Sequence, residues 1–370
     1  MALDRIRLSR FRNHAQSEIA GTARFNLLIG ENGAGKTNVL EAISLLAPGR
    51  GLRRAALVDM VMNHDATGFG VSTELTSGSD AEPIHIGTGT LPDRPARRVV
   101  QINGADSPAN ALSEWLGLFW LTPAMDRLFM DSPGARRRFL DRMVLALEPA
   151  HARHTARYET ALRERARLLF NDAEPDPHWL DAIEAQLAEA GAEVAGARER
   201  LIERLGDGLT VLPSSPFARP ALAYRAGGPT EAPALAQALA DNRRRDRAAQ
   251  RSLVGPHRDE LLVTLAAKQQ PAAECSTGEQ KAMLIAITLA HCNLAQHDGS
   301  PRPRVLLLDE VAAHLDPLRR EALFEQLREG PAQVWITGTE AAPFDAILGE
   351  AACWLLENGV VRKEFSVFKE

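Results

Sequence analysis

The stretch GENGAGKT, residues 30–37, consists of a glycine, four further residues and then Gly-Lys-Thr. It follows the short apolar run RFNLLI (24–29) and precedes NVLEAISLL (38–46), whose apolar spacing predicts a helix. A glycine-rich turn between a buried strand and a helix is the setting in which this pattern binds phosphate. The stretch therefore predicts an α/β core with a nucleotide phosphate site, and the full pattern disfavours an ordinary glycine turn.

Each residue type in this loop has a physical reason to be there. Gly30, Gly33 and Gly35 let the backbone fold around a phosphate chain and direct its amide groups inward. Lys36 is expected to reach the outer phosphates, and Thr37 to offer its hydroxyl to Mg²⁺. The predicted ATP-binding residues of the loop are Gly30, Glu31, Asn32, Gly33, Ala34, Gly35, Lys36 and Thr37.

A second acidic segment, VLLLDE (305–310), lies far along the chain. Its four apolar residues predict a buried strand that delivers two acids at its carboxyl end. Asp309 is suited to hold Mg²⁺, and Glu310 is suited to polarise the attacking water as the catalytic base, acting with Lys36. Many buried strands end in acids, but together with the phosphate loop this segment predicts a hydrolytic ATPase site.

The stretch CSTGEQKA (275–282) predicts a helix start, because Ser276 and Glu279 form a capping box. Capping leaves Gly278 unexplained, since a glycine early in a helix costs up to about 1 kcal/mol relative to alanine. A glycine there is useful where something must approach the backbone closely, and a helix N-terminus attracts anions. The stretch therefore indicates a second phosphate contact, although the first loop already holds the chain's own phosphates.

The composition limits the protein class. The chain has 370 residues, 45% hydrophobic and 25% charged, which is ordinary for a globular protein of two domains or of one with an insertion. A net charge of −5 excludes a uniformly basic surface, so any DNA contact must come from local basic patches. The three cysteines are scattered and the N-terminus has no apolar segment, so we expect a cytoplasmic protein with free thiols and no membrane contact.

The chain changes character twice. The first 120 residues are rich in strand patterns, such as LDRIRLSRF (3–11) and the alternating pieces between 70 and 103. Ser132-Pro133 opens a helix, and NDAEPDPH (171–178) interrupts it. Leucine or valine then recurs every seventh residue from Leu180, which predicts an antiparallel helical hairpin whose second helix is about 40 Å long. The expected domains are an ATPase part over 1–130, a helical insertion over 131–252 and a second ATPase part over 253–370.

Two runs of adjacent arginines flank the helical insertion. Arginines on amphipathic helices are often solvated or paired with neighbouring acids, but three in a row cannot all pair locally. We therefore expect the runs to contact DNA phosphates without reading sequence. The candidate DNA-binding residues are Arg136, Arg137, Arg138, Arg243, Arg244 and Arg245.

CSTGEQ (275–280) resembles the signature motif of ABC-type ATPases, and VAAHLD (311–316) resembles their D-loop. In that superfamily the signature of one copy closes over the ATP bound by another. The resemblance therefore implies an ATP-dependent homodimer in which one copy's signature contacts the other's nucleotide. The residues it assigns to this contact are Ser276, Gly278, Glu279 and Asp316.

The wide separation of 275–282 from 30–37, filled by a short helical insertion, is unlike transporter subunits and is similar to the RecF family. This resemblance implies an ABC-type ATPase head with mixed sheets around the phosphate loop and an inserted helical, coiled-coil-like domain. Further stretches carry the resemblance: LSRFRNH (8–14), SPGARRRFLDRMV (132–144) and GPHRDEL (255–261).

The chain departs from the expected motifs in two places. Pro123–Asp126 stands where the family has Pro-Glu-Asp-Leu, so no equivalent of the Q-loop glutamine is assigned. VWITGTE (334–340) has no switch histidine, and either Thr337 or Thr339 lies near the phosphates or packs at a strand end. His257 and Arg258 are expected in a turn, at an interface or sensing nucleotide.

The resemblance implies an ATP-dependent DNA-binding protein of recombinational repair, replication restart and the SOS response. ATP would clamp the dimer on duplex DNA, a gap junction or single strands, and slow, DNA-stimulated hydrolysis would release it. The RecO and RecR proteins are the implied partners in loading recombinase. The alternatives are a non-catalytic scaffold that ATP merely stabilises and a transport-type ATPase subunit.

Overall fold

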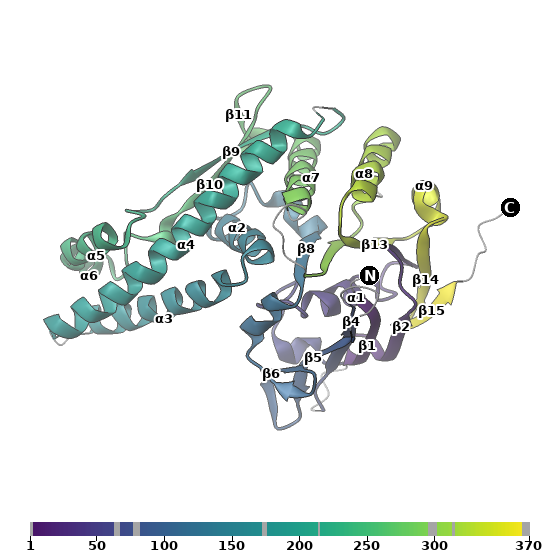
Figure 1. The fold of residues 1–370 in the computed structure, drawn as a ribbon, viewed down its shortest axis with the longest axis horizontal. Coiled ribbons are helices and arrows are strands. Elements are labelled where there is room, and N and C mark those ends of the chain that lie inside the picture. The colour runs from purple at the N-terminus through teal and green to yellow at the C-terminus, as the bar shows by residue number, and fades with distance from the viewer. Residues whose placement is uncertain are drawn as a thin grey trace. The chain divides into compact units, whose positions relative to one another are not determined.

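The computed structural model describes residues 3–62, 67–76, 82–171, 176–213, 215–294, 302–312 and 315–364. The chain divides into two compact units (Figure 1). The first unit comprises Met1–Met125 and Ala295–Glu370, and the second comprises Asp126–Leu294. Both ends of the chain therefore build one unit, and the middle of the chain builds the other.

The first unit contains a six-stranded central sheet with the order β15-β14-β3-β13-β12-β8. All neighbours are parallel except β14 and β15, which form an antiparallel pair. Parallel strands are covered on both faces, which explains why β3 and β13 are buried at every position. The strands are β3 (Phe25–Ile29), β8 (Gly117–Leu121), β12 (Arg304–Leu308), β13 (Gln333–Gly338), β14 (Ala351–Glu357) and β15 (Val360–Glu364).

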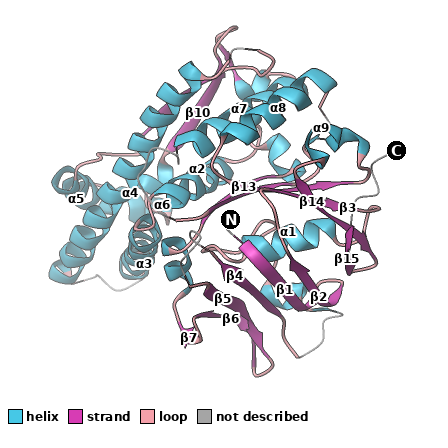
Figure 2. Ribbon diagram, turned by 45° about the vertical axis from the view of Figure 1, so that its right-hand side comes forward, coloured by secondary structure: helices cyan, strands magenta, loops and turns pink. Residues whose placement is uncertain are grey.

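A second, antiparallel sheet of the first unit has the order β2-β1-β4-β5-β6-β7. The helix α1 (Lys36–Ser44) contributes buried residues to one hydrophobic core together with both sheets. Figure 2 shows α1 between the strands β1 and β2 and the strands β13 and β14. The strands of this sheet are β1 (Leu3–Phe11), β2 (His14–Ala20), β4 (Gly70–Leu75), β5 (Ile84–Leu91), β6 (Arg94–Ile102) and β7 (Ala105–Asp106).

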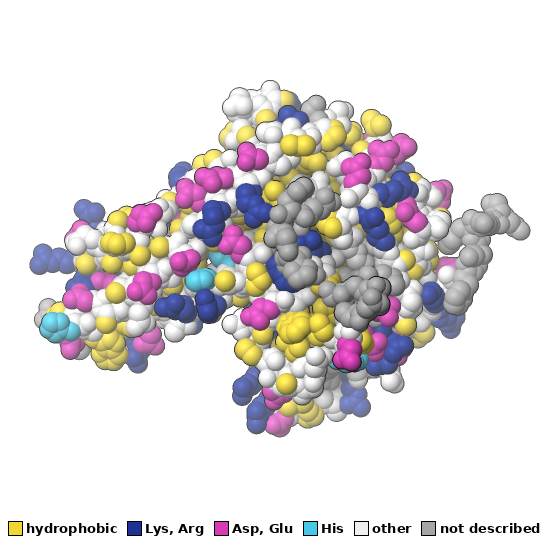
Figure 3. All heavy atoms as spheres, in the orientation of Figure 1, with side chains coloured by type: hydrophobic (Ala, Val, Ile, Leu, Met, Phe, Trp, Pro, Cys, Tyr) yellow, Lys and Arg dark blue, Asp and Glu magenta, His cyan; other side chains and the backbone are white. Residues whose placement is uncertain are grey.

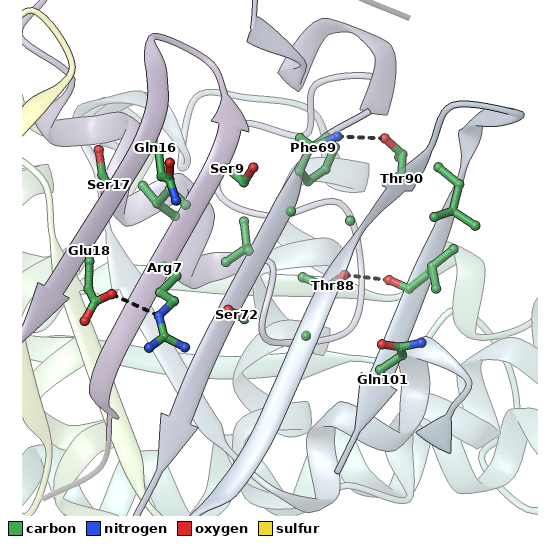
Figure 4. A pocket seen from close by; sticks show the side chains of 17 residues that line it. Arg7, Ser9, Gln16, Ser17, Glu18, Phe69, Ser72, Thr88, Thr90 and Gln101 are labelled. Carbon is green, nitrogen blue, oxygen red and sulfur yellow. Dashed lines mark hydrogen bonds and ion pairs between the residues drawn. The ribbon is translucent and has the colours of Figure 1, made fainter. Parts of the chain in front are cut away.

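The antiparallel sheet also carries a shallow hollow of about 460 Å³ across β1, β4, β5 and β6. Figure 4 shows Arg7, Ser72, Thr88 and Gln101 around it. No residue of the 30–37 loop lines it, so this hollow is not the predicted nucleotide site. The first unit is completed by α8 (Pro317–Glu329), α9 (Asp345–Leu348) and short 3-10 turns at Leu57–Met60, Ala109–Glu114 and Ala342–Phe344.

The second unit is mainly helical, with the three-stranded antiparallel sheet β11-β10-β9. Its long helices α3 and α4 pack against each other along their length, as predicted for a helical hairpin (Figure 1). Its elements are α2 (Pro133–Leu147), α3 (His151–Leu169), α4 (Pro177–Val211), β9 (Pro220–Arg225), α5 (Ala232–Asp241), α6 (Arg243–Ala249), β10 (Glu260–Leu265), β11 (Gln270–Pro271) and α7 (Thr277–Leu294).

The hairpin differs from the sequence prediction in its lengths. The predicted first helix is two helices, because Pro149 cannot continue the hydrogen bonding of α2 and the chain restarts at His151. α4 has 35 residues, which corresponds to about 52 Å rather than about 40 Å. α5 and α6 follow one another with only Asn242 between them.

The second unit also extends further along the chain than the expected insertion. Residues 253–294, predicted to rejoin the ATPase part, belong to the second unit instead. The reason is long-range pairing, because β10 forms its ladder with β9 and α7 packs on α4. Sequence patterns report local element type, and they do not report the strand with which a given strand pairs.

Among the described residues, no helix has both the length and the apolar character needed to cross a lipid bilayer.

Candidate nucleotide site

The glycine-rich loop joins the end of β3 to the start of α1, as the sequence predicts. Gly35 has a φ of 113°, in the left-handed region, and a Cβ there would lie 2.7 Å from the ring nitrogen Nε2 of His14. A Cβ at Gly30 would overlap the carbonyl oxygen of Leu356. Both positions therefore require glycine, and the loop turns sharply enough for its amides to face a phosphate chain.

Lys36 lies at the first position of α1 and is 4% exposed. Its Nζ donates hydrogen bonds to the carbonyl oxygens of Gly30 at 2.6 Å and Glu31 at 2.9 Å. Burial lowers the pKa of Lys36, and the nearby carboxylates of Glu310 and Asp309 oppose that shift. The ammonium group therefore lies inside the loop, beside its backbone carbonyls, which is where this motif binds the outer phosphates of a nucleotide.

Thr37 and Asp309 meet although they are far apart in the sequence. The Thr37 hydroxyl donates to the Asp309 carboxylate oxygen Oδ1 at 2.8 Å. Burial raises the pKa of Asp309, and the hydrogen bonds from Thr37 and Thr337 oppose that shift. A hydroxyl beside a carboxylate at the carboxyl edge of a parallel sheet is a donor set that fits Mg²⁺. The two residues assigned to the metal by sequence therefore lie together.

Glu310 follows directly and has a φ of 53°, the left-handed region that non-glycine residues rarely adopt. Its backbone N–H donates to the hydroxyl oxygen of Thr337 at 2.9 Å. The Glu310 residue is partly exposed, whereas Asp309 is 6% exposed. Asp309 is thus buried within the site, whereas the next acid, Glu310, is partly exposed at its edge.

Sequence reasoning left Thr337 and Thr339 as alternatives, and the structure separates them. Thr337 is fully buried and contacts both acids, donating to Asp309 Oδ1 at 2.9 Å and accepting from Glu310. Thr339 is exposed, beyond the end of β13. The available signal was a hydroxyl residue at the carboxyl end of a buried strand, but the strand order that places it beside β12 is not visible in the sequence.

The backbone carbonyls of the loop also accept hydrogen bonds from residues that sequence reasoning did not assign to the site. The Asn13 side chain donates to the Ala34 carbonyl at 3.2 Å, and the Gly359 amide donates to the same oxygen at 2.9 Å. The His14 ring nitrogen Nε2 lies 3.2 Å from the Gly35 carbonyl. Burial lowers the pKa of His14, which favours its neutral form. These contacts hold the loop in place from two turns that are distant in sequence.

The predicted signature stretch lies at the start of α7, in the second unit. Its capping box is present, with the Glu279 amide 3.3 Å from the Ser276 hydroxyl and the Ser276 amide 3.0 Å from the Glu279 carboxylate. A Cβ added at Gly278 would meet nothing within 4 Å. Among the described residues, none therefore requires a glycine at this position, and Gly278 is exposed.

The predicted D-loop is described only in part, because residues 313–314 lie outside the described residues. Asp316 caps α8, and its side chain accepts a hydrogen bond from the Arg319 amide at 2.9 Å. Its expected place at a dimer interface stays a prediction.

The two arginine runs do not behave as uniform basic patches. Arg136 forms a two-point ion pair with Glu260, with nitrogen–oxygen distances of 2.7 and 3.1 Å, and Arg137 donates to the Asp259 carbonyl at 2.8 Å. Arg243 is bound to Asp181 and Glu184. Arg136, Arg137 and Arg243 therefore have partners within the second unit, against the expectation that adjacent arginines cannot all pair locally, and their contact with DNA stays a prediction.

The exposed members of the two runs are Arg138, Arg244 and Arg245. Figure 3 shows dark-blue Lys and Arg side chains interspersed with magenta Asp and Glu over the helices of the second unit. Mixed charge of this kind is the expected result of local ion pairing. DNA contact stays a prediction for the three exposed arginines.

His257 and Arg258 lie in a 3-10 turn, as the sequence predicts, and contact neighbouring segments of the second unit. The Tyr158 hydroxyl lies 2.7 Å from the His257 ring nitrogen Nδ1, and the other ring nitrogen lies 2.9 Å from the Ser252 carbonyl. Arg258 donates to that same carbonyl. Burial lowers the pKa of His257. The contacts give both residues a structural role, and the expected role at an interface or in sensing nucleotide stays a prediction.

Comparison with known proteins matches residues 2–348 to the family described as the RecF/RecN/SMC N terminal domain. The DNA replication and repair protein RecF of Mesorhizobium japonicum is 44% identical over 371 residues, covering 97% of each chain. The protein of the same name from Caulobacter vibrioides is 44% identical over 380 residues and covers 95% of each chain.

Solved structures support the fold. A structure of the recombination mediator protein RecF with ATP has a TM-score of 0.85 and 22% identity, covering 98% of each chain. The Smc head domain of Pyrococcus furiosus, bound to the C-terminal domain of ScpA, has a TM-score of 0.54 and 16% identity over 98% of this chain and 96% of that one. At these identities the likeness shows the fold alone, which is the ABC/SMC ATPase head predicted from the sequence.

Proposed function

This chain belongs to the RecF family within the RecF/RecN/SMC proteins, and from that membership we propose that it is an ATP-hydrolysing protein of DNA replication and repair. The observation that carries the proposal is the meeting of the phosphate loop with both acids of the 305–310 strand. The Thr37 hydroxyl lies 2.8 Å from Asp309, and Glu310 is turned outward beside it.

The residues divide the chemistry between them. The amides of the 30–37 loop and the Lys36 ammonium group bind the phosphates of ATP. Thr37 and Asp309 hold Mg²⁺, which when bound supplies positive charge that offsets charge developing on the phosphate oxygens. Glu310 orients a water molecule in line with the terminal phosphate and accepts its proton.

ATP also acts as the contact between two copies of the chain. The start of α7 presents free space above Gly278 and the capped Ser276, and these groups close on the terminal phosphate held by a second copy. Such a dimer has two equivalent composite sites, with Asp316 at the interface. Because each ATP contacts both copies, nucleotide binding and dimerisation are thermodynamically linked.

The dimer grips DNA while ATP is bound and releases it after slow, DNA-stimulated hydrolysis. The relatives are named for DNA replication and repair, and a solved neighbour is described as a recombination mediator of the RecFOR pathway. By that likeness, the RecO and RecR proteins are the proposed partners in loading recombinase on duplex DNA, single strands or gap junctions. A slow clamp of this kind is a two-state device biased by nucleotide.

Light scattering with no nucleotide, with ADP and with ATP tests the composite site. The mass of the wild type is expected to double only with ATP, and Ser276→Arg is expected to abolish the doubling. Ser132→Arg is the matched control, because Ser132 caps α2 in the same manner, with its side chain accepting from the Ala135 amide. A mass that ignores ATP, or equal losses in both variants, would contradict the dimer.

Glu310→Gln separates a gated clamp from a scaffold that ATP merely stabilises. Removing the base while keeping the shape is expected to slow hydrolysis strongly, to a measurable residual rate, and to trap ATP-bound dimers on DNA. Dissociation from labelled duplex DNA after dilution would therefore slow strongly relative to wild type. A variant that leaves DNA at the wild-type rate would favour the scaffold.

A further inference from the structure

We propose that Thr337 is a positioning residue for ATP hydrolysis, which aligns both acids of the site through a single hydroxyl group. This inference rests on the proposed ATPase function and deepens it. Thr337 does not itself contact the reacting atoms in this arrangement. It acts through Asp309 and Glu310.

The strand order explains why a residue of β13 reaches both acids. β13 lies between β3, which delivers the phosphate loop, and β12, which delivers Asp309 and Glu310. All three strands are parallel, so their carboxyl ends meet at one edge of the sheet. Thr337 is the penultimate residue of β13 and is fully buried at this edge.

The Thr337 hydroxyl first fixes the carboxylate of Asp309. It donates to Oδ1 at 2.9 Å, and the Thr37 hydroxyl donates to the same oxygen at 2.8 Å. Two donors on one oxygen set the rotation of the carboxylate. Among the described residues, the other oxygen, Oδ2, receives no hydrogen bond. The carboxylate therefore presents one oxygen to the protein and keeps the other available for a cation.

The same hydroxyl oxygen holds the backbone of Glu310. It accepts the Glu310 amide hydrogen at 2.9 Å, at a residue whose φ of 53° lies in the left-handed region that non-glycine residues rarely adopt. That backbone conformation sets the direction in which the Glu310 side chain leaves the strand end. The hydrogen bond thus stabilises the one conformation that turns the second acid outward while the first points inward.

A hydroxyl can perform both tasks at once, because it has one proton to donate and lone pairs to accept. Serine has the same group, so Thr337→Ser keeps the arrangement. Valine has nearly the shape of threonine but can neither donate nor accept. Thr337→Val therefore removes both hydrogen bonds with little change in packing volume, which makes it the informative substitution.

Steady-state and single-turnover ATP hydrolysis, with binding of a fluorescent ATP analogue, test the role. Outer-shell hydrogen bonds of this kind are worth about 10- to 100-fold in activity. Thr337→Val is expected to lower kcat by that factor with KM for ATP unchanged, because the loss falls on the transition state. Thr337→Ser is expected to restore kcat to near the wild-type value.

Thr22→Val is the matched control for a merely structural effect. Thr22 is 5% exposed in the same unit, donates to the Leu3 carbonyl at 2.6 Å and accepts from the Gln333 side chain at 3.1 Å. The Thr22→Val variant therefore also loses one donated and one accepted hydrogen bond, but away from the nucleotide site. Both valine variants are expected to lower the melting temperature comparably, and only Thr337→Val is expected to lower kcat.

A double-mutant cycle with Glu310→Gln supplies the last discrimination. If Thr337 acts partly through Glu310, Thr337→Val reduces single-turnover hydrolysis less in the Glu310→Gln background than in wild type. Wild-type kcat in Thr337→Val, or equal losses of kcat in the Thr22 and Thr337 variants, would overturn the inference alone. A wild type that neither binds nor hydrolyses ATP would overturn the proposed function and this inference together.

Discussion

At the scale of single residues, the ammonium group of Lys36 lies among carbonyl oxygens of its own loop. Both of its hydrogen bonds go to backbone carbonyls, those of Gly30 and Glu31. A buried cation without a directly bonded carboxylate is costly, which is the cause of its lowered pKa. A phosphate chain would supply the missing negative charge.

Lys36→Met is therefore expected to weaken ATP binding by at least about tenfold, since a charge-assisted hydrogen bond is worth roughly 1.5–3 kcal/mol. Stability without nucleotide should change little, because the buried charge is removed together with its bonds. Fluorescent nucleotide titration and thermal unfolding measure the two effects.

The control for that substitution is Lys363→Met. Lys363 is an exposed lysine whose ammonium group also donates a hydrogen bond to a backbone carbonyl, that of Gly21 at 2.9 Å, and the substitution removes it. It should bind ATP as the wild type does. Equal affinities in both methionine variants would show that Lys36 does not contact phosphate.

At the scale of elements, a buried ion cluster joins the helices of the second unit. Arg165 of α3 is fully buried and bonds to Glu184 of α4 at 2.8 Å and Asp246 of α6 at 2.6 Å. The same guanidinium donates to the Ser252 hydroxyl and the Leu239 carbonyl. Arg165 is fully buried, and its contacts join α3, α4 and α6.

Arg165→Leu should lower the free energy of unfolding of the second unit by about 3–5 kcal/mol, because buried Asp246 loses its ion-pair partner and buried Glu184 keeps only Arg243. Arg167→Leu removes an exposed arginine two residues further along the same helix, paired with Glu164 at 3.1 Å, and should cost at most about 1 kcal/mol. Urea unfolding followed by circular dichroism compares the two. Similar midpoints for both leucine variants would refute the structural importance of the cluster.

At the scale of the whole molecule, the net charge of −5 and the interspersed acids mean that DNA contact must depend on few cations. The exposed arginines of the two runs are Arg138, Arg244 and Arg245. Each phosphate contact releases counterions, so binding through them is salt-dependent and indifferent to sequence.

Replacing all three exposed arginines by alanine should weaken ATP-dependent binding to a gapped duplex. It should also reduce the slope of log affinity against log salt by up to about 2.7, at roughly 0.9 per phosphate contact. A charge-matched control replaces Arg7, Arg94 and Arg362, which are exposed in the first unit. An unchanged salt slope in the first variant would remove these arginines from the DNA interface.

The amino-acid sequence alone predicted the elements that bear the chemistry. The glycine loop, Lys36, Thr37 and the two acids follow local patterns, since each needs a fixed spacing beside a strand or helix. The same holds for the capping box at Ser276 and for the existence of the helical hairpin, although not for the lengths of its helices. These features are local, so a linear pattern contains them.

Only the tertiary structure decided the rest. It placed Thr337 between the two acids, because the order β3-β13-β12 follows from strand pairing over long sequence distances. It turned Arg136 and Arg243 inward, because their carboxylate partners come from other segments. It assigned residues 253–294 to the second unit, because β10 pairs with β9. Contacts between distant segments depend on the packing of the whole chain, which no local pattern records.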